Sequence, residues 1–150
     1  MLKPTKKKTI LVAEDDKFIA HAYRNALKLD GYEVEWASDG QEALAIFKKR
    51  RPDLILMDLV MPVLDGFTTL KHLRHQAGGR NVPVIILSNL GQDSDIKQCR
   101  KYGIADYLVK SNVSMSEVLQ AIKKVLKPKK ILKKKKILST AKAFKKIIKK

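Results

Sequence analysis

Five side chains able to hold a metal ion or to react stand at, or just beyond, apolar segments of strand length. Glu14 and Asp15 follow one such segment, Asp58 follows a second, Ser88 closes a third and Lys110 follows a fourth. Carboxylates gathered in one place repel one another, and Mg²⁺ relieves this by accepting one or two of them together with water and phosphate oxygens. We expect Asp15 and Asp58 to bind Mg²⁺ directly and Glu14 through water, with Lys110 as a second, fixed positive charge.

Asp58 is the candidate nucleophile of this set. A carboxylate that attacks phosphorus forms an acyl phosphate, which is an established form of covalent catalysis. In-line phosphoryl transfer depends mostly on positioning and on neutralising charge. We expect the cation and Lys110 to neutralise charge, and the Ser88 hydroxyl with nearby backbone N–H groups to bind the phosphoryl oxygens.

Each signal taken alone has an ordinary structural explanation. Asp16 reads as a helix cap and Asp65, before a glycine, as a turn and helix-start residue. Taken alone, Ser88 would be interpreted as a serine in a turn, and Lys110 as a solvent-exposed lysine at the end of a strand. The combination at four separate strand ends favours the functional interpretation.

These side chains meet only if the apolar segments are strands of one parallel sheet. The pattern predicts strands at 9–13, 32–37, 54–57, 82–87 and 106–109. It predicts helices at 16–29, after Ser38–Gly40, after Asp65–Gly66, at 92–102 and from Ser114 onward. Five pairs of a strand followed by a helix indicate an α/β fold with a doubly wound parallel sheet, whose two faces are covered by the five helices. In such sheets function collects beyond the carboxyl ends of the strands.

The charge of the chain is unevenly distributed. The net charge is +17 over 150 residues, but 127–150 contain 12 lysines and no acidic residue, so the other 126 residues carry only +5. We divide the chain into a basic leader at 1–8, a globular domain at 9–126 and a lysine-rich tail at 127–150. A single cysteine, Cys99, excludes an internal disulfide framework, and no apolar run reaches membrane-spanning or signal-peptide length, so we expect a cytoplasmic protein.

Four segments resemble bacterial response-regulator receiver domains: ILVAEDD at 10–16, LILMDLVMPVLDG at 54–66, VIILSN at 84–89 and ADYLVKS at 105–111. The resemblance covers roughly residues 8–126. It implies a flavodoxin-like sheet with strand order 2-1-3-4-5. It also implies transfer of a phosphoryl group to Asp58 from a sensor histidine kinase or a phosphotransfer protein, with Mg²⁺ as cofactor and the backbone carbonyl of Val60 as a further ligand.

The same resemblance assigns the parts of a switch. Ser88 matches the family's switch hydroxyl and Tyr107 its switch aromatic. Their movement would reshape the face made by the fourth helix, fifth strand and fifth helix, which would then control a downstream protein or drive homodimerisation. Two positions depart from the family pattern. Ser111 follows Lys110 where proline is usual, which leaves the geometry of that peptide open, and Asn89 replaces a smaller residue where it could alter the lifetime of the phosphoryl group.

The tail leaves a second function open. Its apolar residues fall near one helical face from Ile137 onward, which is typical of a basic amphipathic helix. A solvated extension, contact with an anionic membrane and sequence-independent contact with DNA are its three interpretations. The alternative function is therefore constitutive nucleic-acid or membrane binding on a receiver fold.

A metabolic hydrolase is disfavoured because no histidine stands at a strand end. Trp36 is interpreted as a packing residue.

Overall fold

The computed structural model describes residues 6–127 of the chain. Within them, strands and helices alternate in the order β1 (Thr9–Ala13), α1 (Lys17–Leu29), β2 (Glu33–Ala37), α2 (Gly40–Arg50), β3 (Leu54–Met57), α3 (Gly66–His75), β4 (Val84–Ser88), α4 (Asp93–Arg100), β5 (Asp106–Val109) and α5 (Met115–Val125). A short 3-10 turn (Lys110–Asn112) precedes α5. The predicted alternation is confirmed.

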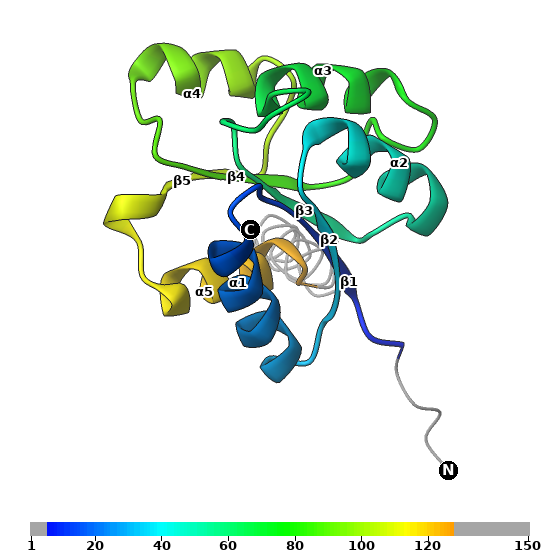
Figure 1. Ribbon diagram of the computed structural model, residues 1–150, viewed down its shortest axis with the longest axis vertical. Coiled ribbons are helices and arrows are strands. Elements are labelled where there is room, and N and C mark those ends of the chain that lie inside the picture. The colour runs from blue at the N-terminus through cyan, green and yellow to red at the C-terminus, as the bar shows by residue number, and fades with distance from the viewer. Residues whose placement is uncertain (1–5, 128–150) are drawn as a thin grey trace, which may run out of the picture.

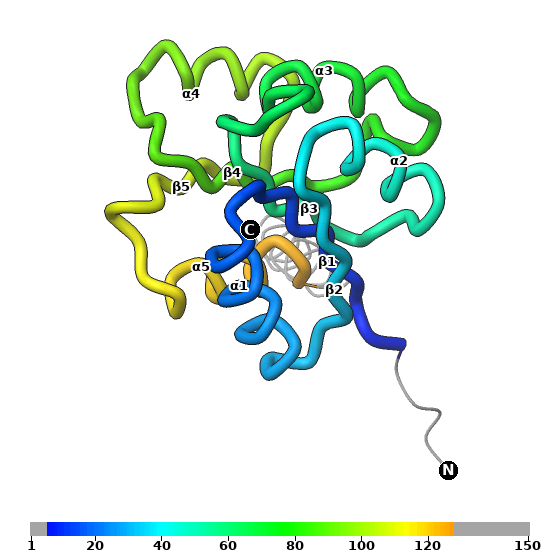
Figure 2. The backbone as a smooth tube through the Cα atoms, viewed as in Figure 1, coloured from blue at the N-terminus to red at the C-terminus, as the bar shows by residue number. Residues whose placement is uncertain are grey.

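The five strands form one parallel sheet in the order β2-β1-β3-β4-β5. Figure 1 shows α2, α3 and α4 on one face of the sheet and α1 and α5 on the other. The backbone trace in Figure 2 shows α1 and α5 side by side, although they are the first and last helices of the described chain. The predicted doubly wound fold and its strand order are confirmed.

Alternation of side chains along the strands divides the core into two clusters. Leu11 and Ala13 of β1 face the cluster that also contains Phe47 and Leu70. Ile10 and Val12 face the opposite side, toward α1 and α5. Every residue of the central strands β3 and β4 is buried, as expected of strands covered on both faces. The loops that follow β3 and β4 therefore begin from strands packed on both faces.

The helix starts follow their capping residues. Asp16 accepts hydrogen bonds from the N–H groups of Phe18 and Ile19, at 2.9 and 3.1 Å, so its interpretation as the cap of α1 is confirmed. Asp65 caps α3 in the same way. α5 begins after Ser114, as predicted, and the side chains of Ser114 and Glu117 form a capping box there.

Four elements differ slightly from their predicted bounds. α1 begins at Lys17 rather than at residue 16, which is its cap. β2 begins at Glu33 rather than at residue 32. β4 spans Val84–Ser88 rather than 82–87, and it begins after Pro83, which has no N–H to donate to a neighbouring strand. α4 spans Asp93–Arg100 rather than 92–102, because Gln92 is its cap and Gly103 takes a left-handed φ of 74° just beyond its end.

No helix within residues 6–127 is long and apolar enough to cross a membrane. The same residues contain no cis peptide bond, so the peptide between Lys110 and Ser111 is trans. The interpretations that concern the tail fall on residues 128–150, outside the described part of the chain.

Candidate functional site

Loops at the carboxyl end of the sheet bring the predicted residues together. The β1–α1 loop carries Glu14 and Asp15, β3 leads directly into Asp58, and Lys110 follows β5. Glu14 and Asp58 are almost fully buried, at 4% and 7% exposure, whereas Asp15 is exposed. A hollow of about 380 Å³ opens onto all four side chains and is also lined by Val60, Ser88 and Asn89.

Lys110 joins the two buried carboxylates. Its Nζ donates to Asp58 Oδ2 at 2.7 Å and also to Glu14 Oε1, and its side chain is only 13% exposed. Burial alone would lower the pKa of Lys110, but the hydrogen bonds and charges of Asp58 and Glu14 outweigh it, so this pKa is raised. The ammonium therefore stays charged at neutral pH.

The other carboxylate oxygen of Asp58 is fixed by the backbone. Asp58 Oδ1 accepts from the N–H of Leu59 at 2.7 Å and from the N–H of Val60 at 3.3 Å. The Asp58 N–H donates to the carbonyl of Ala13 at 3.0 Å, which ties the end of β3 to the end of β1. Both oxygens of the proposed nucleophile are thus oriented before any ligand arrives.

The three acidic side chains are grouped as the ligands of a metal would be. One ligand oxygen from each of Glu14, Asp15 and Asp58 lies within 4.8 Å of the others. Lys110 supplies one positive charge against three carboxylates, and burial raises the pKa of Glu14 even though Lys110 opposes that shift. A cluster of hard oxygen donors with excess negative charge fits a divalent cation such as Mg²⁺. Val60 lines the same hollow, and its carbonyl as a ligand stays a prediction.

Ser88 and Tyr107 occupy different parts of the region. Ser88 is fully buried at the end of β4, lines the hollow and accepts from the N–H of Leu90 at 3.4 Å. Tyr107 is partly buried against the core on the α4 side, and its hydroxyl donates to the carbonyl of Leu90. Burial, with smaller contributions from neighbouring charges, raises the pKa of Tyr107 to about 12. Tyr107 is not among the residues that line the hollow; it reaches the region through Leu90.

Sequence reasoning missed two residues beside the site. Trp36, interpreted as packing only, also donates from Nε1 to the carbonyl of Glu14 at 2.8 Å. Tyr23 of α1 lines a cavity of about 10 Å³ together with Glu14 and Asp58. The position of Trp36 one residue before the end of an expected strand was the available signal. Only the pairing of β2 with β1, which sets Trp36 opposite Val12, brings its indole within reach of the Glu14 carbonyl.

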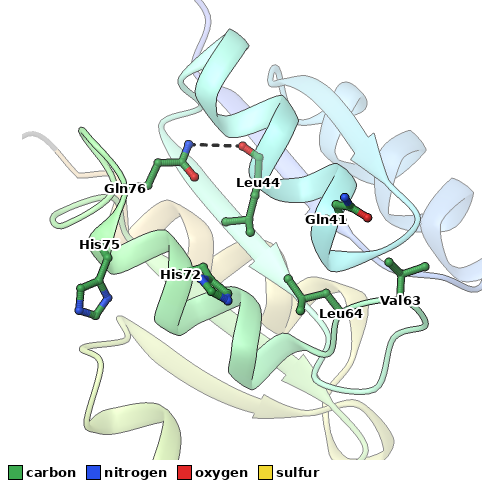
Figure 3. Close-up of a pocket in the computed structure, with 7 residues that line it drawn as sticks. All are labelled: Gln41, Leu44, Val63, Leu64, His72, His75 and Gln76. Carbon is green, nitrogen blue, oxygen red and sulfur yellow. Dashed lines mark hydrogen bonds between the residues drawn. The ribbon is translucent and has the colours of Figure 1, made fainter.

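A second, larger hollow of about 520 Å³ lies between α2 and α3. Figure 3 shows Leu44 and Gln41 on one side of it and His72 and His75 on the other. The side-chain amide of Gln76 donates a hydrogen bond to the Leu44 carbonyl at 3.4 Å. No residue of the acidic cluster lines it. Within residues 6–127 no histidine belongs to a group of side chains placed to hold a metal ion.

Comparison with known proteins identifies the class. A family model described as "Response regulator receiver domain" matches residues 10–123. The chain therefore belongs to the family of response regulator receiver domains, as its sequence motifs predicted.

Several curated relatives are named as transcriptional regulators or probable ones. One is the "Probable transcriptional regulator ycf27" of Porphyridium aerugineum, 39% identical over 121 residues, which are 81% of this chain and 49% of the relative. Another is the "DNA-binding dual master transcriptional regulator RpaA" of Synechocystis, 36% identical over 118 residues, which are 79% of this chain and 48% of the relative. This chain spans about half the length of the curated relatives it matches.

Solved structures of receiver domains are similar throughout the described fold. The chemotaxis protein CheY4 of Vibrio cholerae has a TM-score of 0.76 and 31% identity, covering 81% of this chain and all of that one. The receiver domain of a sensor histidine kinase from Pseudomonas aeruginosa has a TM-score of 0.72 and 32% identity, covering 79% and 97%. That structure holds a magnesium ion in its active-site cleft.

Proposed function

We propose that this receiver domain is a phosphorylation-controlled switch that accepts a phosphoryl group on Asp58. The supporting observation is the environment of Asp58. Its carboxylate is nearly buried, accepts a hydrogen bond from Lys110 at 2.7 Å, and lines one hollow together with Glu14 and Asp15. A carboxylate held only for structure would not need a cluster of like charges beside it. The phosphodonor we propose is the phosphohistidine of a sensor histidine kinase or phosphotransfer protein.

The side chains divide the transfer among themselves. An Asp58 oxygen attacks the phosphorus, the bond between phosphorus and the donor's histidine nitrogen breaks, and that nitrogen keeps the electron pair. The Lys110 ammonium can exchange its hydrogen bond to Glu14 for one to a phosphoryl oxygen. The Ser88 hydroxyl and the N–H groups of Leu59 and Val60 can donate to the remaining phosphoryl oxygens. Glu14, Asp15 and Asp58 would hold Mg²⁺, which when bound neutralises phosphoryl charge.

The phosphorylated state would be communicated through Ser88 and Tyr107. Movement of the Ser88 hydroxyl toward the phosphoryl group would alter the segment that contains Leu90, and with it the partner of the Tyr107 hydroxyl. The surface that would respond is formed by α4, β5 and α5. We propose that a downstream protein, or a second copy of this chain on activation, binds there.

Turnover of substrate is not part of the proposed function. No histidine of the described chain lines the hollow to serve as a general base, and the transfer ends on the protein itself. Slow loss of the phosphoryl group to water is expected, with Asn89 at the wall of the hollow affecting its rate. Because the proposed donor is a sensor histidine kinase, we propose the cytoplasm as the place of exchange.

Curated relatives include a "Probable transcriptional regulator" and a "DNA-binding dual master transcriptional regulator", so we propose control of transcription as the output. The alternative is a constitutive contact of the basic tail with DNA or an anionic membrane, which rests on the sequence of 127–150 alone. A tail that bound equally well whether or not Asp58 was phosphorylated would favour that alternative.

The test is labelling by acetyl phosphate with and without Mg²⁺, followed by intact-mass analysis. We expect one phosphoryl adduct that requires Mg²⁺ and is absent from Asp58→Asn. Asp93→Asn, which removes an exposed carboxyl of α4, is the matched control and should label normally. An undiminished adduct in Asp58→Asn would falsify the assignment of the acceptor.

A further inference from the structure

Both backbone groups of Glu14 are held by the edge strand β2. The Glu14 N–H donates to the carbonyl of Ala37 at 3.0 Å. The Glu14 carbonyl accepts from Trp36 Nε1 at 2.8 Å. Because β1 ends at Ala13, Glu14 already lies outside the strand. Its carbonyl therefore accepts from the Trp36 side chain instead of from a backbone N–H group.

These two hydrogen bonds fix two successive peptide planes. A peptide unit is planar, so holding one of its polar atoms restricts the whole unit. The N–H of Glu14 belongs to the unit that joins Ala13 to Glu14, and its carbonyl belongs to the unit that joins Glu14 to Asp15. The Trp36 indole thus restricts the second of these units, from which the chain continues to Asp15.

The indole is itself well placed to act as a rigid donor. Its backbone is paired with Val12 of β1, and its ring lies against the ring of His21 on α1, with centroids 5.9 Å apart and planes tilted by 54°. An aromatic side chain has only two rotatable bonds, so little freedom remains once its ring is in contact.

We propose that Trp36 is a positioning residue for the metal-binding loop: its N–H holds the Glu14 carbonyl so that the Glu14 and Asp15 carboxylates face Asp58. This role rests on the proposed function, since it presupposes that the acidic cluster binds Mg²⁺. It differs from packing in one respect that can be tested. Packing depends on the shape of the ring, whereas positioning depends on one N–H group.

The sequence makes a one-atom test practical, because Trp36 is the only tryptophan in the chain. The indole can be replaced throughout by β-(3-benzothienyl)alanine, an isostere in which sulfur stands in place of the N–H. Mg²⁺ affinity is then measured by titration calorimetry at pH 7.5, with the free energy of unfolding measured in EDTA as a check on the fold. Losing one neutral hydrogen bond should weaken Mg²⁺ binding about three- to tenfold.

His21→Ala is the matched control, because it removes the ring against Trp36 and leaves the hydrogen bond. We expect its Mg²⁺ affinity to stay within about twofold of the wild type. The intrinsic fluorescence of Trp36 should also respond to Mg²⁺ in the wild type and lose that response in Asp15→Asn.

The outcomes separate this inference from the function on which it rests. If the wild type binds Mg²⁺ and the isostere binds it equally well, the positioning role is wrong and the proposed function is untouched. If His21→Ala weakens binding as much as the isostere does, packing accounts for Trp36 and the inference is overturned. If the wild type does not bind Mg²⁺, both are overturned.

Discussion

Ser88 and Tyr107 are connected through the two ends of a single residue. The Leu90 N–H donates to the Ser88 hydroxyl, and the Leu90 carbonyl accepts from the Tyr107 hydroxyl. One hydroxyl lines the acidic hollow and the other lies outside it, among residues that pack beneath α4. We therefore expect a change in the position of Ser88 to alter the environment of Tyr107 through Leu90.

Tyr107→Phe tests this connection. The variant keeps the ring but removes the hydrogen bond to Leu90, so we expect the free energy of unfolding in urea to fall by about 1 kcal/mol or less. The rate of Asp58 labelling by acetyl phosphate should stay within about twofold, because Tyr107 does not line the hollow. In NMR spectra, the shift of the Leu90 amide resonance on addition of beryllofluoride, used as a mimic of the phosphoryl group on Asp58, should be smaller in the variant than in the wild type. A drop of more than tenfold in labelling would instead place the hydroxyl in the transfer step.

Lys110→Met should destabilise the metal-free protein. The variant keeps the apolar stem but leaves the carboxylates of Glu14 and Asp58 close together without their cation, and both are at least nine-tenths buried. We expect a loss of about 3–5 kcal/mol in urea unfolding at pH 7.5 in EDTA. Mg²⁺ should stabilise this variant more than the wild type. Lys97→Met, an exposed lysine of α4, is the control, and an equal loss in that variant would refute the ionic explanation.

Glu14→Gln should change how stability depends on pH. Burial raises the folded-state pKa of Glu14 above its ordinary value of 4.5, so its contribution is most favourable below that value and is lost as pH rises through the raised folded value. Glutamine does not titrate and can still accept from Lys110. We therefore expect the metal-free variant to match the wild type below pH 4.5 and to exceed it in stability at pH 7.

The measurement is urea unfolding in EDTA at several pH values. Glu33→Gln, which neutralises an exposed carboxyl at the start of β2, controls for the change in net charge. A Glu14→Gln variant less stable than the wild type at pH 7 would show that the bond to Lys110 outweighs burial. With saturating Mg²⁺ the order should reverse, because the cation gains from the full set of carboxylates.

Val63→Asn should stabilise the protein. Val63 has a φ of +66°, and the N–H of Leu64 donates back across it to the Pro62 carbonyl at 2.7 Å, so a β-branched residue occupies a left-handed position in a tight turn. Its side chain is 74% exposed, so little packing is lost on substitution. Asparagine tolerates this backbone conformation, and we expect a gain of about 1 kcal/mol in urea unfolding. Val60→Asn, at an exposed valine of the same loop that lacks a positive φ, should show no gain.

Several parts of the fold and the site were predictable because they depend on local pattern. Unbroken apolar runs such as Leu54–Met57 predicted buried parallel strands, and the caps at Asp16, Asp65 and Ser114 follow from short-range hydrogen bonding. The boundaries of α4 were less predictable, because whether Gln92 caps or joins the helix depends on the geometry of the preceding loop.

The sequence by itself determined the candidate residues of the site: the acidic pair, Asp58, Ser88 and Lys110 are recognisable by type and by their place at or after the strand ends. Only the tertiary structure decided how they are connected. Lys110 reaches across from β5 to Glu14, 96 positions away along the chain, and Trp36 reaches from β2 to the Glu14 carbonyl. Such contacts depend on strand order and register, which no local pattern specifies, because they arise when segments distant in sequence become neighbours in one sheet.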